Sequence, residues 1–143
     1  MIYVTMRVSD GSSRAMRVKF LVDSGAIMSV LPEKDWKTLR LRGRETVEFF
    51  LADGTPIRRT VAEGRFYHQG IERWSPVVLG SGRDVALLGS LTLETMGLVP
   101  HPLERRLRPM RMMLAAASLP KVYPAATFGS RFSESAIASV GYS

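Results

Sequence analysis

The chain contains the run Phe20-Leu21-Val22-Asp23-Ser24-Gly25-Ala26, in which a short apolar segment leads straight into a turn that carries a carboxylate. Residues 20–22 are typical of the end of a strand, and Asp, Ser and Gly are residues that form tight turns. The run therefore predicts that Asp23 is presented on a turn at the end of a strand. Taken alone, the three turn residues fit an ordinary surface turn best, so the surrounding sequence decides the interpretation.

The sequence before this run predicts a hairpin. Apolar and polar residues alternate from Ile2 to Arg7, a turn signal follows at Asp10-Gly11, and the alternation resumes from Met16 to Phe20. Alternation with a period of two is the pattern of a half-buried strand. The hairpin therefore delivers the chain to Asp23.

The sequence after the run predicts further strands. One hairpin joins residues 46–51 to residues 56–61 through Asp53-Gly54, because both residues of such a turn can take positive φ. A second joins 64–67 to 74–79 and turns near residues 68–70, and a last one turns around Pro102. The apolar run over 85–89 is typical of a short strand that is buried on both faces.

Two short helices are expected between these strands. Pro32 suits the first position of one helix, which places Trp36 on its apolar face and Asp35 on its surface. Ser90 suits the cap of a second helix over residues 91–96, and Gly97 suits its end. The chain is therefore expected to be mainly β, with one or two short helices.

Composition sets the broad class of the protein. A length of 143 residues and 45% hydrophobic residues fit one globular domain. We expect that domain over residues 1–114, and a flexible or loosely docked tail over 115–143, where Ala, Ser and Pro dominate. The chain has no cysteine, which excludes thiolate metal sites, disulfides and cysteine nucleophiles. With no signal-peptide pattern and no apolar run long enough for a membrane span, we expect a cytoplasmic protein without a membrane partner.

The net charge of +7 raises the question of nucleic-acid binding. Most of the basic residues are scattered and alternate with apolar ones, as on a solvated strand face, which argues against a nucleic-acid partner. One denser cluster remains as a weaker nucleic-acid hypothesis, and it consists of Arg105, Arg106, Arg108 and Arg111. His68 and His101 have no partner at a metal-ligand spacing, so no metal site is predicted.

A carboxylate on a turn can do acid and base chemistry when it is paired. Two carboxylates about 3 Å apart cannot both ionise and share one proton, so one can activate water while the other donates a proton. The residues after Asp23 suit such a site, because Ser24 offers a hydroxyl for hydrogen bonds, Gly25 permits close backbone approach, and Ala26 leaves the turn unobstructed. Only one such run occurs in the chain, so the second aspartate has to come from another copy.

With these features, the chain resembles the retropepsin-type aspartic proteases, the single-lobe family that includes the retroviral proteases and their bacterial and archaeal relatives. The resemblance covers about residues 1–110. The family's Asp-Thr/Ser-Gly-Ala motif matches residues 23–26 and makes Asp23 the catalytic residue. Its hydrophobic-hydrophobic-Gly motif, which lies behind the catalytic loop, matches Leu87, Leu88 and Gly89.

The resemblance implies a closed-barrel-like lobe and an aspartic endopeptidase that works as a homodimer on protein or peptide substrates. Each subunit contributes one Asp23, and the two together activate a water molecule without a metal or cofactor. The hairpin over residues 49–57 corresponds to the flap that covers the substrate. The flap residues expected to bind substrate are Leu51, Ala52, Asp53, Gly54 and Thr55.

Some positions depart from the viral pattern. Ile27, Met28 and Ser90 stand where the retroviral proteases commonly carry an acidic residue and an arginine that brace the dimer, so a different brace is expected here. Asp53 at the flap tip is either a turn former, the reading that we favour, or a group that reaches substrate. The alternative function is a protein-binding or assembly module that keeps the fold but cleaves nothing, since a fold does not imply a function.

Overall fold

The computed structural model describes residues 1–110. These residues fall into two compact units, of which the first comprises Met1–Thr46 and Arg59–Met110 and the second comprises Val47–Arg58. The predicted boundary between residues 114 and 115 lies outside the described residues, as does the predicted tail.

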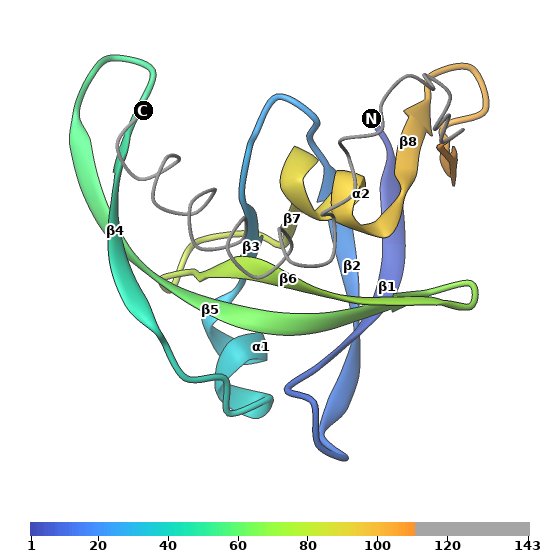
Figure 1. The fold of residues 1–143 in the computed structure, drawn as a ribbon. Coiled ribbons are helices and arrows are strands. Elements are labelled where there is room, and N and C mark those ends of the chain that lie inside the picture. The colour runs from blue at the N-terminus through green and yellow to red at the C-terminus, as the bar shows by residue number, and fades with distance from the viewer. Residues whose placement is uncertain (111–143) are drawn as a thin grey trace, which may run out of the picture. The chain divides into compact units, whose positions relative to one another are not determined.

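The first unit is organised around one large sheet (Figure 1). Its strands are β1 (Tyr3–Ser9), β2 (Ala15–Val22), β3 (Ser29–Leu31), β5 (Pro56–His68), β6 (Ile71–Leu79) and β7 (Leu87–Leu88). They follow the order β1-β2-β7-β3-β6-β5, and β1 also pairs with β5, so the pairings return to the strand from which they began. The expected mainly-β, barrel-like fold is therefore confirmed.

The predicted N-terminal hairpin is also confirmed. β1 and β2 are antiparallel, with Met6 opposite Val18 and Val4 opposite Phe20. One face of the hairpin is buried and the other is exposed, as the alternation requires.

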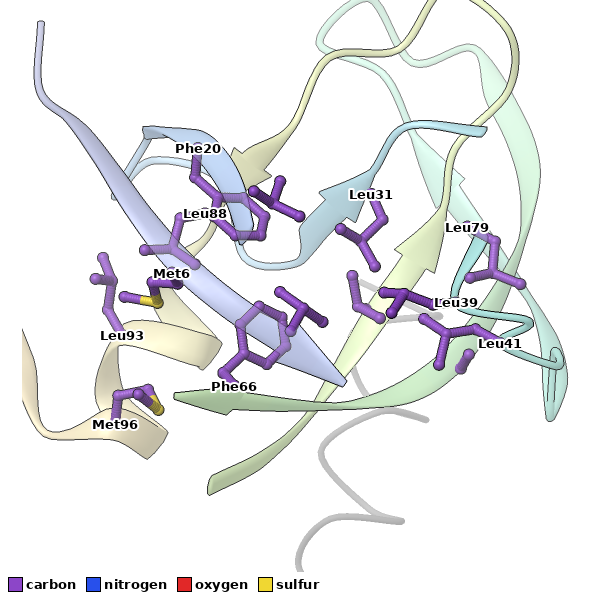
Figure 2. Packing of buried hydrophobic residues seen from close by; sticks show 14 of the residues in the cluster. Met6, Phe20, Leu31, Leu39, Leu41, Phe66, Leu79, Leu88, Leu93 and Met96 are labelled. Atoms are coloured by element: carbon purple, nitrogen blue, oxygen red, sulfur yellow. The ribbon is translucent and has the colours of Figure 1, made fainter. Parts of the chain in front are cut away.

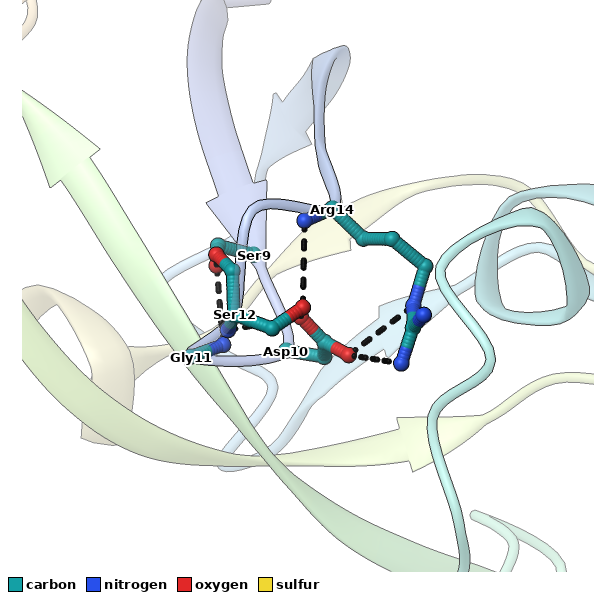
Figure 3. A network of polar contacts seen from close by, with 5 residues as sticks. All are labelled: Ser9, Asp10, Gly11, Ser12 and Arg14. Atoms are coloured by element: carbon teal, nitrogen blue, oxygen red, sulfur yellow. Dashed lines mark hydrogen bonds and ion pairs between the residues drawn. The ribbon is translucent and has the colours of Figure 1, made fainter.

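The turn between β1 and β2 is held by Asp10 (Figure 3). Its Oδ1 accepts the Ser12 backbone N–H at 2.9 Å, and its Oδ2 lies 2.8 Å from a guanidinium nitrogen of Arg14. The hydrogen bonds from Ser12, followed by Arg14, hold the pKa of the Asp10 carboxyl below its usual value. Asp10 is thus a structural residue of this turn, as expected.

Both predicted helices are present with shifted starts. α1 (Glu33–Thr38) begins one residue after Pro32, which is its cap with extended ψ rather than its first residue. Asp35 is 8% exposed, so its predicted surface position is wrong. α2 (Ser90–Met96) ends as predicted at Gly97, whose φ of 68° is left-handed.

The two hairpins that β5 forms have different turns. Gln69 and Gly70 both have positive φ and join β5 to β6 in a two-residue turn, with His68 opposite Ile71. At the other end, only Gly54 has positive φ, so the expected turn with two positive φ values at Asp53-Gly54 is wrong. The strands predicted over 56–61 and 64–67 are one continuous strand, β5.

The core of the first unit lies on the inner face of the sheet (Figure 2). Phe20 and Phe66 are fully buried with ring centroids 5.9 Å apart. Leu88, Leu93 and Met96 bring β7 and α2 into the same cluster. Because full burial of one such side chain is worth roughly 1.5–3 kcal/mol, this cluster fixes β7 and α2 against β2.

The described chain ends in a small two-stranded sheet. β8 (Leu98–His101) pairs with β9 (Arg106–Pro109) around Pro102, as predicted. In the loop between them, Glu104 Oε1 lies 2.9 Å from Arg106 Nε, and Glu104 Oε2 lies 3.5 Å from a guanidinium nitrogen of Arg108. The hydrogen bond from Arg106 is the main cause that lowers the pKa of Glu104. Within residues 1–110, no helix has the length and apolar character needed to cross a membrane.

Candidate active site

Asp23 lies immediately after the last residue of β2, on an exposed loop. Its backbone N–H donates to the Leu88 carbonyl at 2.9 Å, and its own carbonyl accepts the Ala26 N–H at 3.1 Å. The carboxylate Oδ1 accepts the Gly25 N–H at 3.0 Å. The predicted placement of a carboxylate on a tight turn at the end of a strand is therefore what the structure shows.

The strand β7 lies directly under this loop. It pairs parallel with β2, with Val22 opposite Leu88, and antiparallel with β3, with Val30 opposite Leu87. β7 thus fills the gap between the two strands that the Asp23 loop connects. A run of two apolar residues is sufficient for this role, because Leu88 is fully buried and both flanking strands supply hydrogen bonds.

The first turn of α2 donates hydrogen bonds to the second half of the Asp23 loop, at residues 26 and 27. Its Ser90 N–H donates to the Ala26 carbonyl at 2.8 Å, and its Leu91 N–H donates to the Ile27 carbonyl at 3.0 Å. The first N–H groups of a helix have no partner within the helix and need an acceptor elsewhere. The predicted capping by Ser90 is wrong, since the cap residue is Gly89, which has no side chain to cap the helix.

Gly89 is required by the closeness of this packing. A Cβ built at Gly89 would lie 2.7 Å from the carbonyl oxygens of Ile27 and Met28. These are backbone atoms, which cannot rotate away as a flexible side chain can. The glycine of the Leu87-Leu88-Gly89 run is therefore explained by contact with the Asp23 loop.

A buried hydroxyl network ties the loop, β6 and α2 together. Ser29, Ser75 and Thr92 are all completely buried. The Thr92 hydroxyl lies 2.6 Å from that of Ser29 and 2.9 Å from that of Ser75, and Ser29 Oγ also accepts the Gly89 N–H at 2.9 Å. These bonds fix the backbone of Gly89 beneath the loop.

Replacing Thr92 with valine should destabilise the protein by about 1–3 kcal/mol, because the hydroxyls of Ser29 and Ser75 lose a buried partner. Urea unfolding measures the effect. The Thr92→Ser variant keeps the hydroxyl and serves as the matched control. Equal stability of the valine variant and the wild type would show that the network has no energetic role.

The residues that follow Asp23 differ in their surroundings. Ser24 is exposed, Ala26 is half-buried, and Ile27 has 47% of its surface exposed. A Cβ at Gly25 would lie 3.3 Å from Asp23 Oδ1, closer than most side chains approach. Gly25 thus allows the carboxylate to fold back onto its own turn, and Ser24 and Ile27 face outward beside it.

The second unit is the hairpin between β4 (Glu45–Phe50) and the start of β5. The Leu51 N–H donates to the Thr55 carbonyl at 2.9 Å, and the Gly54 N–H donates to the Leu51 carbonyl at 2.8 Å. The tip residues Leu51, Ala52, Asp53, Gly54 and Thr55 are all exposed.

Asp53 closes the hairpin tip through Thr55. Its Oδ1 accepts the Thr55 backbone N–H at 2.9 Å. Hydrogen bonding from Thr55, first by its side chain and then by its backbone, lowers the pKa of the Asp53 carboxyl. This geometry favours the turn-forming interpretation of Asp53, because the hydrogen bonds engage its carboxylate within its own turn.

The remaining polar candidates have local roles. Asp84 Oδ2 accepts the Ser81 N–H at 2.7 Å, and His101 Nδ1 accepts the Glu104 N–H at 3.2 Å. His68 is half-buried, and this burial is the main cause that lowers its pKa. Across residues 1–110, no group of three or more His, Cys, Asp or Glu side chains could hold a metal ion.

The support for the loop includes residues that sequence reasoning did not find. Ser29 and Thr92 are 63 positions apart, and neither belongs to a recognisable motif. The available signal was weak, since Ser29 opens an apolar strand and Thr92 lies between two leucines of α2. Polar residues in such positions need a buried partner, but the sequence does not identify it.

Comparison with solved structures finds similarity to EIAV protease complexed with the inhibitor HBY-793. That protein is 18% identical to this chain, with a TM-score of 0.49 over 66% of this chain and 86% of the other. Comparisons with protein-family models and with curated proteins find no match.

Proposed function

We propose that this chain is an aspartic endopeptidase of the retropepsin-like type, in which two copies each contribute Asp23 to one active site. The observation that carries the proposal is the placement of Asp23. Its carboxylate is exposed at the end of β2, while the loop beneath it is fixed by β7 and by the first turn of α2. A reacting group has to be accessible and also held in a defined position.

The proposed reaction needs a second carboxylate close to the first. With two Asp23 side chains sharing one proton, the ionised carboxylate takes a proton from water as that water attacks the peptide carbonyl carbon. The protonated carboxyl donates its proton to the carbonyl oxygen. The tetrahedral intermediate then collapses with cleavage of the C–N bond, and a proton goes to the leaving amine.

The surface around Asp23 supports a second copy as the source of that group. Ile27, only four residues from Asp23, exposes 47% of its surface although it is a large apolar side chain. The Ser24 hydroxyl is exposed between them and is free to bond across a dimer axis in this proposal. A symmetric dimer places each loop against its own copy, as the shared site requires.

The hairpin tip over residues 51–55 is proposed to bind the substrate. Phe50 and Leu51 are about half exposed, at 50% and 48%, so apolar groups are available at the tip for an extended peptide. Gly54 has a φ of 87°, which lets the chain reverse there. In this proposal Asp53 holds the shape of the tip through Thr55 and does not take part in the chemistry.

The direct test is incubation of the purified chain with a peptide library over a range of pH, with and without a pepstatin-type transition-state inhibitor. We expect inhibitor-sensitive cleavage within the peptides. A protein that stays monomeric at micromolar concentration and leaves the whole library intact would instead support the non-catalytic binding module.

A further inference from the structure

The outer face of the strands β1, β2, β5 and β6 carries an unusual set of side chains. Cross-strand neighbours share a face of a sheet, and the register places Arg7 opposite both Arg17 and Tyr67. The same face carries Tyr3 and Lys19 on one side and Trp74 on the other. We call this set the outer face; its residues are Tyr3, Arg7, Arg17, Lys19, Tyr67 and Trp74.

Three large aromatic rings on this face are open to solvent. Tyr3, Tyr67 and Trp74 are 51%, 39% and 47% exposed. A cation lies over each ring: Lys19 Nζ is 5.0 Å from the centroid of Tyr3, and Arg7 Cζ is 5.4 Å from that of Tyr67. Arg65 Cζ lies 5.9 Å from Trp74. Every exposed ring of the outer face thus has a positive charge beside it.

Two cations on this face lie where they repel each other. Arg7 and Arg17 are directly opposite each other, and like charges in such pairs destabilise a sheet. The acidic residue placed next to Tyr67 by the register, Glu72, already pairs with Arg65 at 2.7 Å. The Arg7–Arg17 pair therefore carries a cost to the fold, which a bound anion would offset.

The positive surface continues past Trp74. A hollow of about 560 Å³ is lined by Trp74 together with Arg40, Arg42 and Arg44. Two acidic residues also line it: Asp10, which is paired with Arg14, and Glu63. Trp74 is therefore the residue of the outer face that also borders a second cluster of arginines.

We propose that the outer face binds single-stranded nucleic acid, independently of the site at Asp23. Single strands are held by aromatic rings on which bases stack and by cations that contact the phosphates between them. The outer face offers both groups side by side on a sheet. An acidic protein segment would use the cations but does not carry a planar group beside every charge, as a nucleic acid does, and the bases of a duplex are not free to stack on the rings.

Sequence reasoning argued against a nucleic-acid partner because the basic residues are scattered along the chain. The register of β1 with β2 and β5 changes that argument, since it collects Arg7, Arg17 and Lys19 on one face. The predicted cluster near Arg105 is a poorer candidate, because Arg106 and Arg108 are both paired with Glu104.

The test is fluorescence anisotropy of the full chain with a labelled oligothymidylate of about 20 nucleotides, titrated at several salt concentrations. If Arg7, Arg17 and Lys19 each contact a phosphate, the slope of log K against log salt should be about −2 for a single strand. Asp23→Asn should bind equally well, so the result is separate from the peptidase assay.

One variant tests the stacking of bases on the aromatic rings, and another tests the contact of phosphates with the cations. Trp74→Ala should weaken binding by at least about fivefold at every salt concentration, as loss of one stacked base does. Arg17→Glu should weaken binding and flatten the salt slope by roughly 0.7 to 1, while its thermal midpoint rises because Arg7 gains an opposite charge across the strand. A merely structural role for Arg17 would not move stability and binding in opposite directions.

Arg73→Glu is the matched control, because it makes the same charge change at an exposed position of β6 that the register places opposite Phe66, a residue of the buried face of the sheet. It should bind as the wild type does. The proposal is overturned if no oligonucleotide binds at about 50 mM salt, where phosphate contacts are strong. It is also overturned if Arg73→Glu weakens binding as much as Arg17→Glu, if Trp74→Ala has no effect, or if polyglutamate or anionic vesicles compete as well as the oligonucleotide.

Discussion

Asp23→Asn is expected to reduce peptide cleavage by at least about a thousandfold while the fold stays intact, because an amide can neither accept nor donate the proton that the reaction moves. The asparagine oxygen can still accept the Gly25 N–H that Asp23 Oδ1 accepts at 3.0 Å. The backbone bonds from Asp23 to Leu88 and Ala26 do not involve the side chain. Cleavage rates of the wild type and the variant measure the loss of activity, and thermal unfolding of both proteins shows whether the fold stays intact.

Asp84→Asn provides the control for this change. Asp84 is another aspartate that holds a local turn, with Oδ2 2.7 Å from the Ser81 N–H, and it lies outside the proposed site. It should cleave peptides at close to the wild-type rate. If Asp23→Asn retained more than about a tenth of the wild-type rate, the loss would be far below what general acid and base catalysis contributes, and Asp23 would not be the reacting group.

Gly89→Ala is expected to lower the free energy of unfolding by about 1–3 kcal/mol, because it overpacks a site closed by backbone on two sides. Its Cβ would lie 2.7 Å from the carbonyl oxygens of Ile27 and Met28. To make room, either the Asp23 loop or the start of α2 must move. Cleavage should therefore fall together with the free energy of unfolding, which urea denaturation measures.

Gly82→Ala is the matched control for this substitution. A Cβ at Gly82 meets nothing within 4 Å, and its backbone does not have the left-handed conformation. Its stability should stay within about 0.5 kcal/mol of the wild type, as for most surface changes. An unchanged unfolding free energy for Gly89→Ala would mean that the loop is not braced through this contact.

Local signals were sufficient to predict much of the fold. The alternation over β1 and β2 and the Asp10-Gly11 turn defined the first hairpin, because one face of it packs on the core and the other meets water. Gly97 ended α2 because a residue without Cβ adopts a φ of 68° easily. Asp23 was found because its turn follows directly from the strand before it.

The interactions that hold the loop could not be predicted in the same way. The first N–H groups of α2 find their acceptors at Ala26 and Ile27, so the helix needs no side-chain cap and the Ser90 prediction was wrong. The Ser29–Thr92 bond joins positions far apart in the chain. The pair Asp53-Gly54 is compatible with hairpin turns of more than one length. The hydrogen bond from the Leu51 N–H to the Thr55 carbonyl closes the longer of these turns.

The central claim is that one active site is shared by two copies of the chain. Mixing wild-type protein with a threefold excess of Asp23→Asn and allowing the subunits to exchange tests it most directly. If each site needs two Asp23 carboxylates, cleavage per wild-type chain should fall to about one quarter, because only about one partner in four is then wild type. Cleavage per wild-type chain that stays constant after exchange would show that each chain works alone, and would contradict the shared site.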